Sequence, residues 1–201
     1  MSREHWDERY GVPELVWTAE PNRFLVEEVG PLSPGRALDL ACGEGRNALW
    51  LASRGWQVTG VDFSRVGLDK ARLQCTNLGL EVNWVEADVV EWTPPAASFD
   101  LVLVLYLHLP SAQRRKALAQ AKRALSPGGV LLVVGHDSSN ILHGAGGPKD
   151  PAVLYRLEEI AEDISGLEIV RAQRVTRNVV TDDGEATAID ALIRAVRSRQ
   201  S

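Results

Sequence analysis

Cysteine is scarce in this sequence of 201 residues, which also lacks a long apolar run and an excess of positive charge. The two cysteines, Cys42 and Cys75, follow no metal-ligand spacing and are too few for a disulfide framework, so we expect no metal site and a reducing compartment. The longest apolar run, "LVLVLYL" at 101–107, is far too short to cross a bilayer. The amino-terminal "MSREHWDERYG" has no apolar segment typical of a signal peptide. These absences predict a soluble, cytoplasmic protein with no membrane partner.

The missing positive charge bears on possible partners. The net charge is −5, from 22 Lys and Arg against 27 Asp and Glu. Because binding to phosphate backbones needs clustered Lys and Arg, we expect no nucleic-acid partner. Basic residues group only at 114–116 and 122–123, on one expected helix, where a solvated helix face accounts for them. The length predicts a single domain, 1–201, with one substantial core and with monomer or homodimer left open.

Apolar runs and helix-like patterns alternate along the chain. Helices are expected after residue 45 up to Gly55, from Ser64 to about Leu78, and from Ser111 to about Leu125, where "SPGG" (126–129) is the expected terminator. The expected strands are 36–41, 57–62, 82–88, 99–107 and 130–135. Because strands separated by helices pair in parallel through right-handed crossovers, the pattern predicts a doubly wound, Rossmann-like α/β sheet.

The carboxyl-terminal part breaks this alternation. After a helix expected near 151–164, two strand-like segments follow, "LEIVRAQRVTRNVVT" and "EATAIDALIRAVR", with only "DDG" (182–184) between them. Asp-Gly is a strong hairpin signal, so the mostly parallel sheet is expected to end in an antiparallel hairpin. The domain then has three parts: a lid-like segment at 1–30, a cofactor-binding core at 36–135, and the helix and hairpin at 151–201.

Two cofactors suit the glycine-rich turn after the first strand. Residues 43–48 fit G-x-G-x-x-G/A, and Asp62 stands about twenty residues on, where a dinucleotide's ribose would be bound. Asp39 argues against this reading, because a carboxylate ahead of the turn would repel a pyrophosphate but attract the ammonium of S-adenosylmethionine. Asp88 could accept from an adenine amino group. Only residues 136–201 follow the fifth strand, which leaves little room for a dehydrogenase's catalytic domain.

The successive motifs resemble those of class I S-adenosylmethionine-dependent methyltransferases. They are "LDLACGEGRN", "GVDFS", "EADV", "FDLVLVLYLHLP" and "LSPGGVLLVVG". The resemblance implies a seven-stranded sheet whose last strand is antiparallel. The amino-terminal "HWDERYG" and "VW", together with "CGEGRN", look most like the small-molecule branch that contains tellurite-resistance and thiopurine methyltransferases.

The resemblance also implies where the cofactor binds. Asp62 would accept from the ribose hydroxyls, Phe63 would lie along the adenine, and Arg46 would pair with Asp39 or with the cofactor carboxylate. The alternatives are a helix cap at Asp62 and core packing of Phe63. The full set of implied cofactor-binding residues is Trp17, Asp39, Leu40, Ala41, Gly43, Gly45, Arg46, Asp62, Phe63, Asp88, Val89 and Leu105.

Methyl transfer from a sulfonium is an in-line displacement that mainly needs alignment and exclusion of water. A general base helps with a hydroxyl acceptor and is dispensable for a thiolate. The candidate catalytic residues are Tyr106, His108 and His136, at the carboxyl edge where open sheets bind ligands. Hydrogen-bonding loop histidines are the alternative for both imidazoles. Asp137 and Asn140 could orient His136 or contact a substrate.

Two segments are candidates for covering this edge: the aromatic residues Trp6, Tyr10 and Trp17, and the glycine-rich loop at 143–151. Simple packing on the sheet is the alternative. The predicted function is methyl transfer to a small-molecule acceptor, which could be a thiol, a metalloid oxyanion, a phenol or an amine. Strand four lacks the "[DN]PP[YF]" tetrapeptide of amino-methylating nucleic-acid enzymes. Other open readings are a nicotinamide-dinucleotide-dependent oxidoreductase and a non-catalytic S-adenosylmethionine-binding module.

Overall fold

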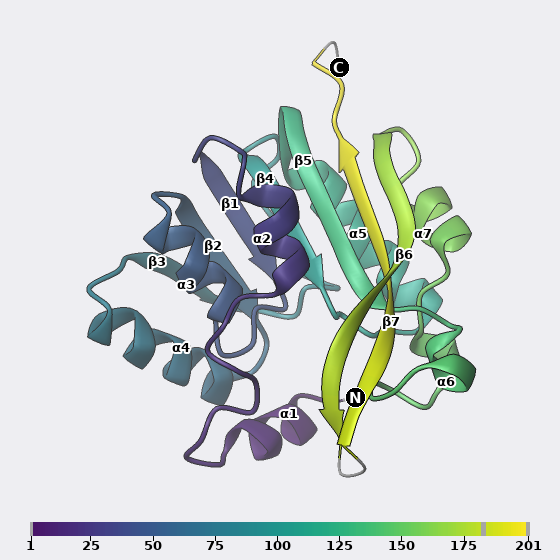
Figure 1. Ribbon diagram of the computed structural model, residues 1–201. Coiled ribbons are helices and arrows are strands. Elements are labelled where there is room, and N and C mark those ends of the chain that lie inside the picture. Colours follow the sequence, from purple (N-terminus) through teal and green to yellow (C-terminus); the bar gives the residue numbers. More distant parts are fainter. Residues whose placement is uncertain (1, 182–183, 200–201) are drawn as a thin grey trace.

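The computed structural model describes residues 2–181 and 184–199. Its centre is a seven-stranded sheet with the order β3-β2-β1-β4-β5-β7-β6 (Figure 1). Neighbouring strands pair in parallel from β3 to β5, while β7 is antiparallel to both β5 and β6. The strands are β1 Arg36–Leu40, β2 Gln57–Asp62, β3 Val82–Glu86, β4 Phe99–Leu105, β5 Leu125–His136, β6 Glu168–Thr181 and β7 Gly184–Val196. The predicted doubly wound sheet with a terminal antiparallel hairpin is confirmed.

Helices cover both faces of this sheet, with α2 in front of it and α5 behind it in Figure 1. Helices α2, α3 and α4 share one face, α5 and α7 cover the other, and α1 crosses below the lower edge of the sheet. The helices are α1 Arg3–Tyr10, α2 Arg23–Val29, α3 Arg46–Ser53, α4 Arg65–Asn77, α5 Ser111–Ala124, α6 Asn140–His143 and α7 Leu157–Asp163.

Alternation along the strands builds a core on each face. Leu38 and Leu40 of β1 point to the α5 and α7 side, whereas Ala37 packs with α2 and α3. Strand β4 is buried almost throughout, and Leu101 and Val102 are fully enclosed on opposite faces. A continuous apolar run in the sequence therefore corresponds to a strand that is covered on both sides.

Several boundaries differ from the sequence expectations; β4, for example, ends at Leu105 and not at 107. "SPGG" does not terminate α5, because the chain enters β5 directly at Leu125, which pairs with Phe99 before a register shift. Gly128, at φ 82°, allows this irregularity. The helix expected at 151–164 is a 3₁₀ turn, Pro151–Val153, followed by α7. Strand β3 ends at Glu86, so Asp88 lies in the following loop.

The hairpin joins the two longest strands of the sheet. Its ladder runs from Glu168 opposite Val196 to Thr181 opposite Gly184, which has φ 109°. The first two residues of the expected "DDG" turn, 182 and 183, lie outside the described residues. Within the described ranges, no helix is both long and apolar enough to cross a bilayer.

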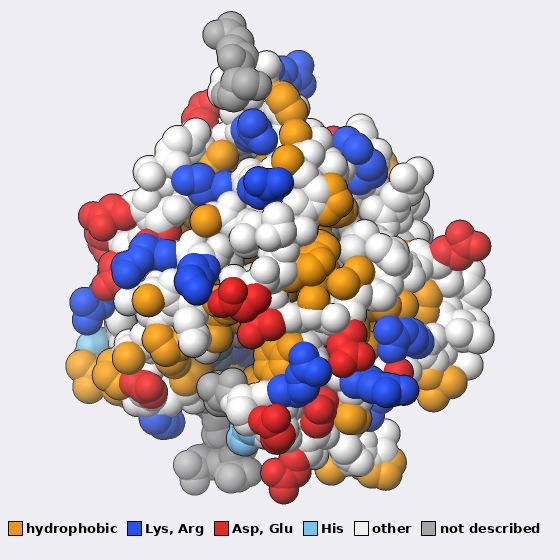
Figure 2. Space-filling view, turned by 180° about the vertical axis from the view of Figure 1, so that it is seen from behind, with side chains coloured by type: hydrophobic (Ala, Val, Ile, Leu, Met, Phe, Trp, Pro, Cys, Tyr) orange, Lys and Arg blue, Asp and Glu red, His pale blue; other side chains and the backbone are white. Residues whose placement is uncertain are grey.

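A buried ion pair joins α5 to α7. Arg114 is 2% exposed and donates to Asp163 at 2.9 Å and to Glu159 at 3.0 Å. Arg114 is enclosed, whereas on the outer surface of this side of the molecule acidic and basic side chains are exposed and mixed, as the lower half of Figure 2 shows. A buried carboxylate that loses its partner keeps its desolvation cost, so removal of one member of this pair should destabilise the fold.

We predict that Arg114→Leu lowers the free energy of unfolding by about 3 kcal/mol, because Asp163 keeps its buried charge without a counterion. Urea unfolding checks this value. The matched control is Arg115→Leu on the exposed side of the same helix, which should change the free energy by less than about 0.5 kcal/mol. Equal effects of the two substitutions would show that the pair contributes nothing.

Candidate functional site

The candidate site lies at the carboxyl ends of the parallel strands. β1 has β2 on one side and β4 on the other, so the chain leaves β1 and β4 toward opposite parts of the sheet. Such a reversal of strand order opens the crevice in which α/β sheets bind ligands. Asp39 and Asp62, near the ends of β1 and β2, therefore meet at this crevice as the sequence predicted.

Asp39 is a buried acid with an unsatisfied oxygen. Its side chain is 1% exposed, and its Oδ2 has no hydrogen-bond partner among the described residues. Burial, and secondarily the charge of Asp62, raises the pKa of Asp39 to about 7, while Arg46 acts in the opposite direction. An enclosed carboxylate in this state is matched by a cationic hydrogen-bond donor.

The turn after β1 is held by the second acid. The two carboxylate oxygens of Asp62 accept from the backbone N–H groups of Gly43 and Ser64, each at 2.8 Å. These bonds lower the pKa of Asp62, but its burial is the larger effect and the net direction is upward. Asp62 thus fixes the turn to β2, which is a structural role in addition to any contact with a ribose.

Packing explains why the turn contains glycine. Both Gly43 and Gly45 have positive φ, 55° and 82°. A Cβ on Gly43 would lie 2.6 Å from the hydroxyl of Tyr10, and one on Gly45 would lie 2.6 Å from Cη2 of Trp84. The first contact comes from Tyr10, so the absence of a side chain at Gly43 leaves room for the amino-terminal segment above the turn.

The amino-terminal segment is seated directly on the turn. Tyr10 is 5% exposed and packs on Gly43 and on Gly67 of α4, where a Cβ would lie 3.1 Å from the tyrosine ring. Ser64 donates to Asp7 at 2.5 Å. Trp6 stacks on Tyr10 with ring centroids 5.3 Å apart. These contacts place α1 over the glycine turn rather than on a face of the sheet.

Glu44, between the two glycines, holds the part of the amino-terminal segment that follows α1 by hydrogen bonds. Its side chain is 4% exposed and accepts from the backbone N–H groups of Val16 and Trp17, each at 3.2 Å. Lys70 of α4 donates to Glu44 at 3.0 Å and also to the carbonyl of Glu14 at 2.6 Å. Sequence reasoning missed Glu44 and Lys70, because their partners lie far away in the sequence and neither residue belongs to a recognisable motif of its own.

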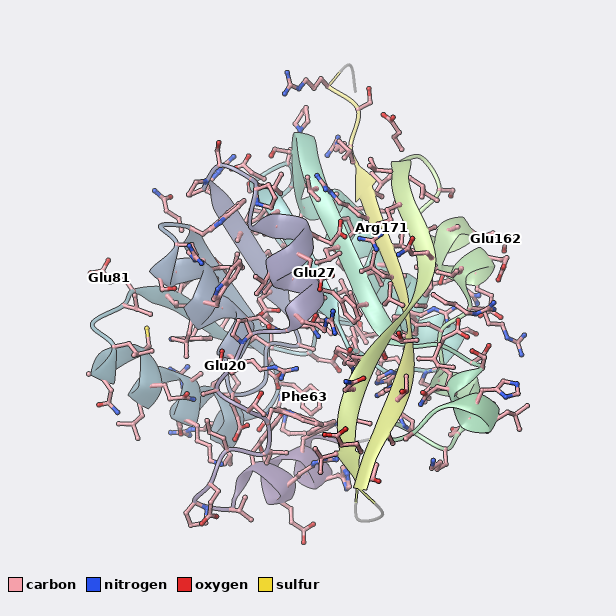
Figure 3. All side chains as sticks on the ribbon, in the orientation of Figure 1. Glu20, Glu27, Phe63, Glu81, Glu162 and Arg171 are labelled. Carbon is pink, nitrogen blue, oxygen red and sulfur yellow. The ribbon has the colours of Figure 1, made fainter. Side chains whose placement is uncertain are left out.

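The other implied cofactor residues line the same edge to different depths. Leu40, Val89 and Leu105 are buried, Ala41 has φ 59°, and Arg46 at the start of α3 donates to Thr18 at 3.4 Å. Phe63 is half-buried, and Figure 3 shows it at the lower edge of the sheet, above α1.

Two of the implied residues are exposed. Asp88 accepts from the backbone N–H of Val90 at 2.9 Å. Trp17 is 40% exposed and lies 4.9 Å from the guanidinium of Arg9.

The three candidate catalytic residues come together beside β4 and β5. The ring of His136 lies 5.3 Å from that of Tyr106 and 5.2 Å from that of His108, measured between centroids. His108 Nε2 accepts from the backbone N–H of His136 at 3.1 Å, and burial lowers the pKa of His108 to about 3. Tyr106 has φ 58° and donates its hydroxyl hydrogen to Asp190 at 2.7 Å. Burial, together with the charge of Asp190, raises the pKa of Tyr106.

The carboxyl-terminal hairpin supplies two residues that sequence reasoning did not identify. Asp190 of β7 is fully buried and accepts from Tyr106 and from Nε of Arg177 on β6, the latter at 2.8 Å. Arg177 Nε also donates to the Tyr106 hydroxyl at 3.1 Å. Neither residue follows a motif, and both reach the site only through strand pairing.

Asp137 and Asn140 hold the neighbouring loop. Asp137 Oδ1 accepts from Ser139 and from Arg174, whereas its Oδ2 is buried without a partner in the described part of the chain. The side-chain oxygen of Asn140 accepts from the backbone of Ile189 at 2.7 Å, and its amide nitrogen donates to the carbonyl of Gly146 at 3.0 Å. These bonds fix the path of the loop.

With this geometry established, comparison shows which proteins the chain is similar to. Residues 37–129 match the family described as "Methyltransferase domain", a span that covers β1 through the start of β5. This match covers somewhat less than half of the chain, and it agrees with the resemblance of the sequence motifs to class I S-adenosylmethionine-dependent methyltransferases.

Named relatives and solved structures are similar to parts or nearly all of the chain. The chain is 40% identical over 123 residues to a demethylmenaquinone methyltransferase of Thermus thermophilus, covering 60% of this chain and 54% of the relative. It is 33% identical over 106 residues to a ribosomal RNA small subunit methyltransferase C of Alcanivorax borkumensis, covering 50% of this chain and 32% of the relative. The chain thus spans about half or less of the length of these relatives.

Two solved structures share the fold over nearly the whole chain. The first, described as "Conversion of a Disulfide Bond into a Thioacetal Group during Echinomycin Biosynthesis", has a TM-score of 0.79 at 24% identity and covers 99% of this chain and 93% of its own. The second, TehB from Haemophilus influenzae, has a TM-score of 0.74 at 17% identity and covers 98% of this chain and 67% of its own.

The raised pKa of Asp39 predicts a pH dependence of stability. Without a ligand the folded protein holds this proton up to about pH 7, while the unfolded chain releases it near the ordinary value of 3.8. The free energy of unfolding therefore falls as pH rises from about 4 to about 7, by up to ~4 kcal/mol from this group. Urea unfolding at several pH values should show the fall, and Asp39→Asn should remove its largest part. An unchanged slope in the variant would contradict the assignment.

Proposed function

We propose that the protein transfers a methyl group from S-adenosylmethionine to a small-molecule acceptor. The observation that carries this proposal is the buried, unpartnered Oδ2 of Asp39 beside the glycine turn. The ammonium of the cofactor is the cation that such an oxygen lacks, whereas a pyrophosphate would add repulsion. A dinucleotide-dependent oxidoreductase has no support in the family comparison.

Residues at the edge of the sheet divide the work of holding the cofactor. Asp39 would accept from the ammonium, and Arg46 at the start of α3 would pair with the carboxylate. Asp62 would accept from the ribose, while Phe63, Asp88 and Val89 would contact the adenine. The cofactor supplies a methyl group already activated by the sulfonium charge. The protein's task is alignment and exclusion of water.

Enclosure of the site supports a small acceptor. Tyr10, Glu44 and Lys70 fasten the amino-terminal segment over the turn, and the loop at 143–151 lies against His136. A segment seated over the turn in this way suits a free metabolite better than a base within folded RNA, although one relative is named for ribosomal RNA. The name of the demethylmenaquinone relative agrees with a small acceptor. We further propose a cytoplasmic location, consistent with two free, buried cysteines.

Binding of S-adenosylhomocysteine tests the cofactor assignment. Because the ammonium must find Asp39 ionised, affinity should increase as pH rises from about 5 to 7, and calorimetry in buffers of different ionisation enthalpy should show proton release. Asp39→Asn should weaken binding by about 1–3 kcal/mol and remove most of the pH dependence. Asp69→Asn, at an exposed site on α4, is the matched control and should bind normally. Equal affinity of the Asp39 variant and the wild type would disprove the proposal.

The cover can be loosened without damage to the helix beneath it. Gly67→Ala in α4 should raise intrinsic helix stability by about 0.5–1 kcal/mol but push Tyr10 away, because the added Cβ would lie 3.1 Å from its ring. The gain in helix propensity is opposed by the lost packing of the buried Tyr10, so we expect little net change in stability, together with faster dissociation of S-adenosylhomocysteine and greater quenching of tryptophan fluorescence by acrylamide. Stopped-flow dissociation measures the rate. A variant with a wild-type dissociation rate would show that the segment does not cover the cofactor.

A further inference from the structure

Two of the three candidate proton acceptors at the edge of the sheet are already occupied. The Nε2 of His108 accepts from the backbone of His136, so its lone pair is used. The hydroxyl of Tyr106 donates to Asp190 and accepts from Arg177. Neither group can take a proton from a bound acceptor without losing a buried hydrogen bond. His136 is the remaining candidate.

His136 faces Asp190 across the β5–β7 ladder, in which the two residues are direct partners. Nδ1 of the imidazole lies 3.2 Å from Oδ1 of the carboxylate, and the side chains are 8% and 0% exposed. Within the described residues neither atom has a well-aligned hydrogen bond. Loose alignment is common in catalytic pairs before the acceptor binds. A neutral imidazole with its hydrogen on Nδ1 would donate to Asp190 and leave Nε2 as the acceptor.

Arg177 completes the pair from the other strand of the hairpin. Its Nε is used by Asp190 and by Tyr106, which orients the guanidinium. No partner of its two terminal nitrogens is found among the described residues, and the side chain is 24% exposed. Those nitrogens are donors available to an oxygen that acquires negative charge.

We propose that His136, positioned by Asp190, is the base that deprotonates a hydroxyl acceptor, and that Arg177 stabilises the developing oxyanion. This inference rests on the proposed methyl transfer. The acceptor O–H proton moves to Nε2 of His136, while an electron pair of the acceptor oxygen forms the bond to the methyl carbon. The sulfonium carbon–sulfur bond breaks, and its electron pair remains on the sulfur of S-adenosylhomocysteine.

The need for a base selects the acceptor class. A phenol-like hydroxyl ionises near pH 10, whereas a thiol ionises near pH 8.5 and reacts as its anion without help. A built imidazole–carboxylate pair therefore points to phenols or enols. Gly147 lies against the imidazole. A Cβ there would lie 2.5 Å from Cδ2 of His136, so the loop shields the imidazole from bulk water.

Other charged and titratable groups share the surroundings of His136. These groups contribute equally to the pH profiles of all variants in which they are not substituted. They are Tyr106, His108, Asp137, Tyr155, Arg174, Arg177 and Asp190.

The test compares two probes, catechol and thiophenol, with S-adenosylhomocysteine release as the readout. His136→Asn should lower kcat for catechol about 10²–10⁴-fold and change that for thiophenol by less than about threefold. Asp190→Asn should lower kcat for catechol at least about tenfold and flatten its pH profile. Asp69→Asn, at an exposed site on α4, is the matched control and should leave both activities unchanged. Equal losses on both probes, or turnover of thiophenol alone by the wild type, would overturn the inference.

A second measurement needs neither an acceptor nor a folded variant. Long-range ¹⁵N NMR of the wild type with S-adenosylhomocysteine bound should show neutral His136 with its hydrogen on Nδ1 and a bare Nε2. A hydrogen on Nε2 would exclude the base, whatever the acceptor. Failure to bind S-adenosylhomocysteine at all would instead refute the proposed function, so the two failures are distinguishable.

Discussion

The interaction on which the site depends is the set of bonds that Asp62 makes to the turn after β1. Its carboxylate accepts from the backbone of both Gly43 and Ser64, which ties β1, β2 and the start of α4 together. The turn is also held by the backbone bonds from Cys42 to Val61 and from Gly45 to Cys42, but among the described residues only Asp62 joins it to the start of α4 through one side chain. The same bonds keep Asp62 close to Asp39, and this proximity helps to raise the pKa of Asp39. The site thus keeps two buried acids near each other, an arrangement that costs free energy in the absence of a cation.

The cover over the site uses the same turn. Glu44 stands between the two glycines whose backbone is expected to approach the cofactor, and its side chain holds the backbone of Val16 and Trp17. A shift of the turn would move these hydrogen bonds, and a shift of the segment would pull on the turn. The buried pair with Lys70 makes this coupling stiff, since both charges are enclosed and each needs the other. Through Glu44 the amino-terminal segment and the glycine turn are therefore joined directly rather than through a long path.

Sequence patterns predicted the parts of this molecule that depend on local chain chemistry. The order of β1 to β5, the hairpin, and the meeting of Asp39 with Asp62 follow from periodicity, turn residues and the geometry of parallel sheets. Boundaries were less accurate where tertiary pairing overrides a local signal, as at "SPGG", which continues into β5 because Leu125 pairs with Phe99. Glu44, Arg177 and Asp190 could not be predicted, because each acts through a partner that is distant in sequence and is fixed only by strand register or by packing of the cover.

The hairpin shows why register matters for chemistry as well as for packing. Side chains on a strand alternate between faces, so a slip of one residue between β5 and β7 would place Ile189 or Ala191 opposite His136 instead of Asp190. The Asp190 carboxylate would then point to the opposite face. Tyr106, whose backbone is in the left-handed region, would lose the hydrogen-bond acceptor of its hydroxyl. The antiparallel end of the sheet, which a plain parallel sheet would lack, therefore brings the acid and the guanidinium to the edge where the acceptor is expected.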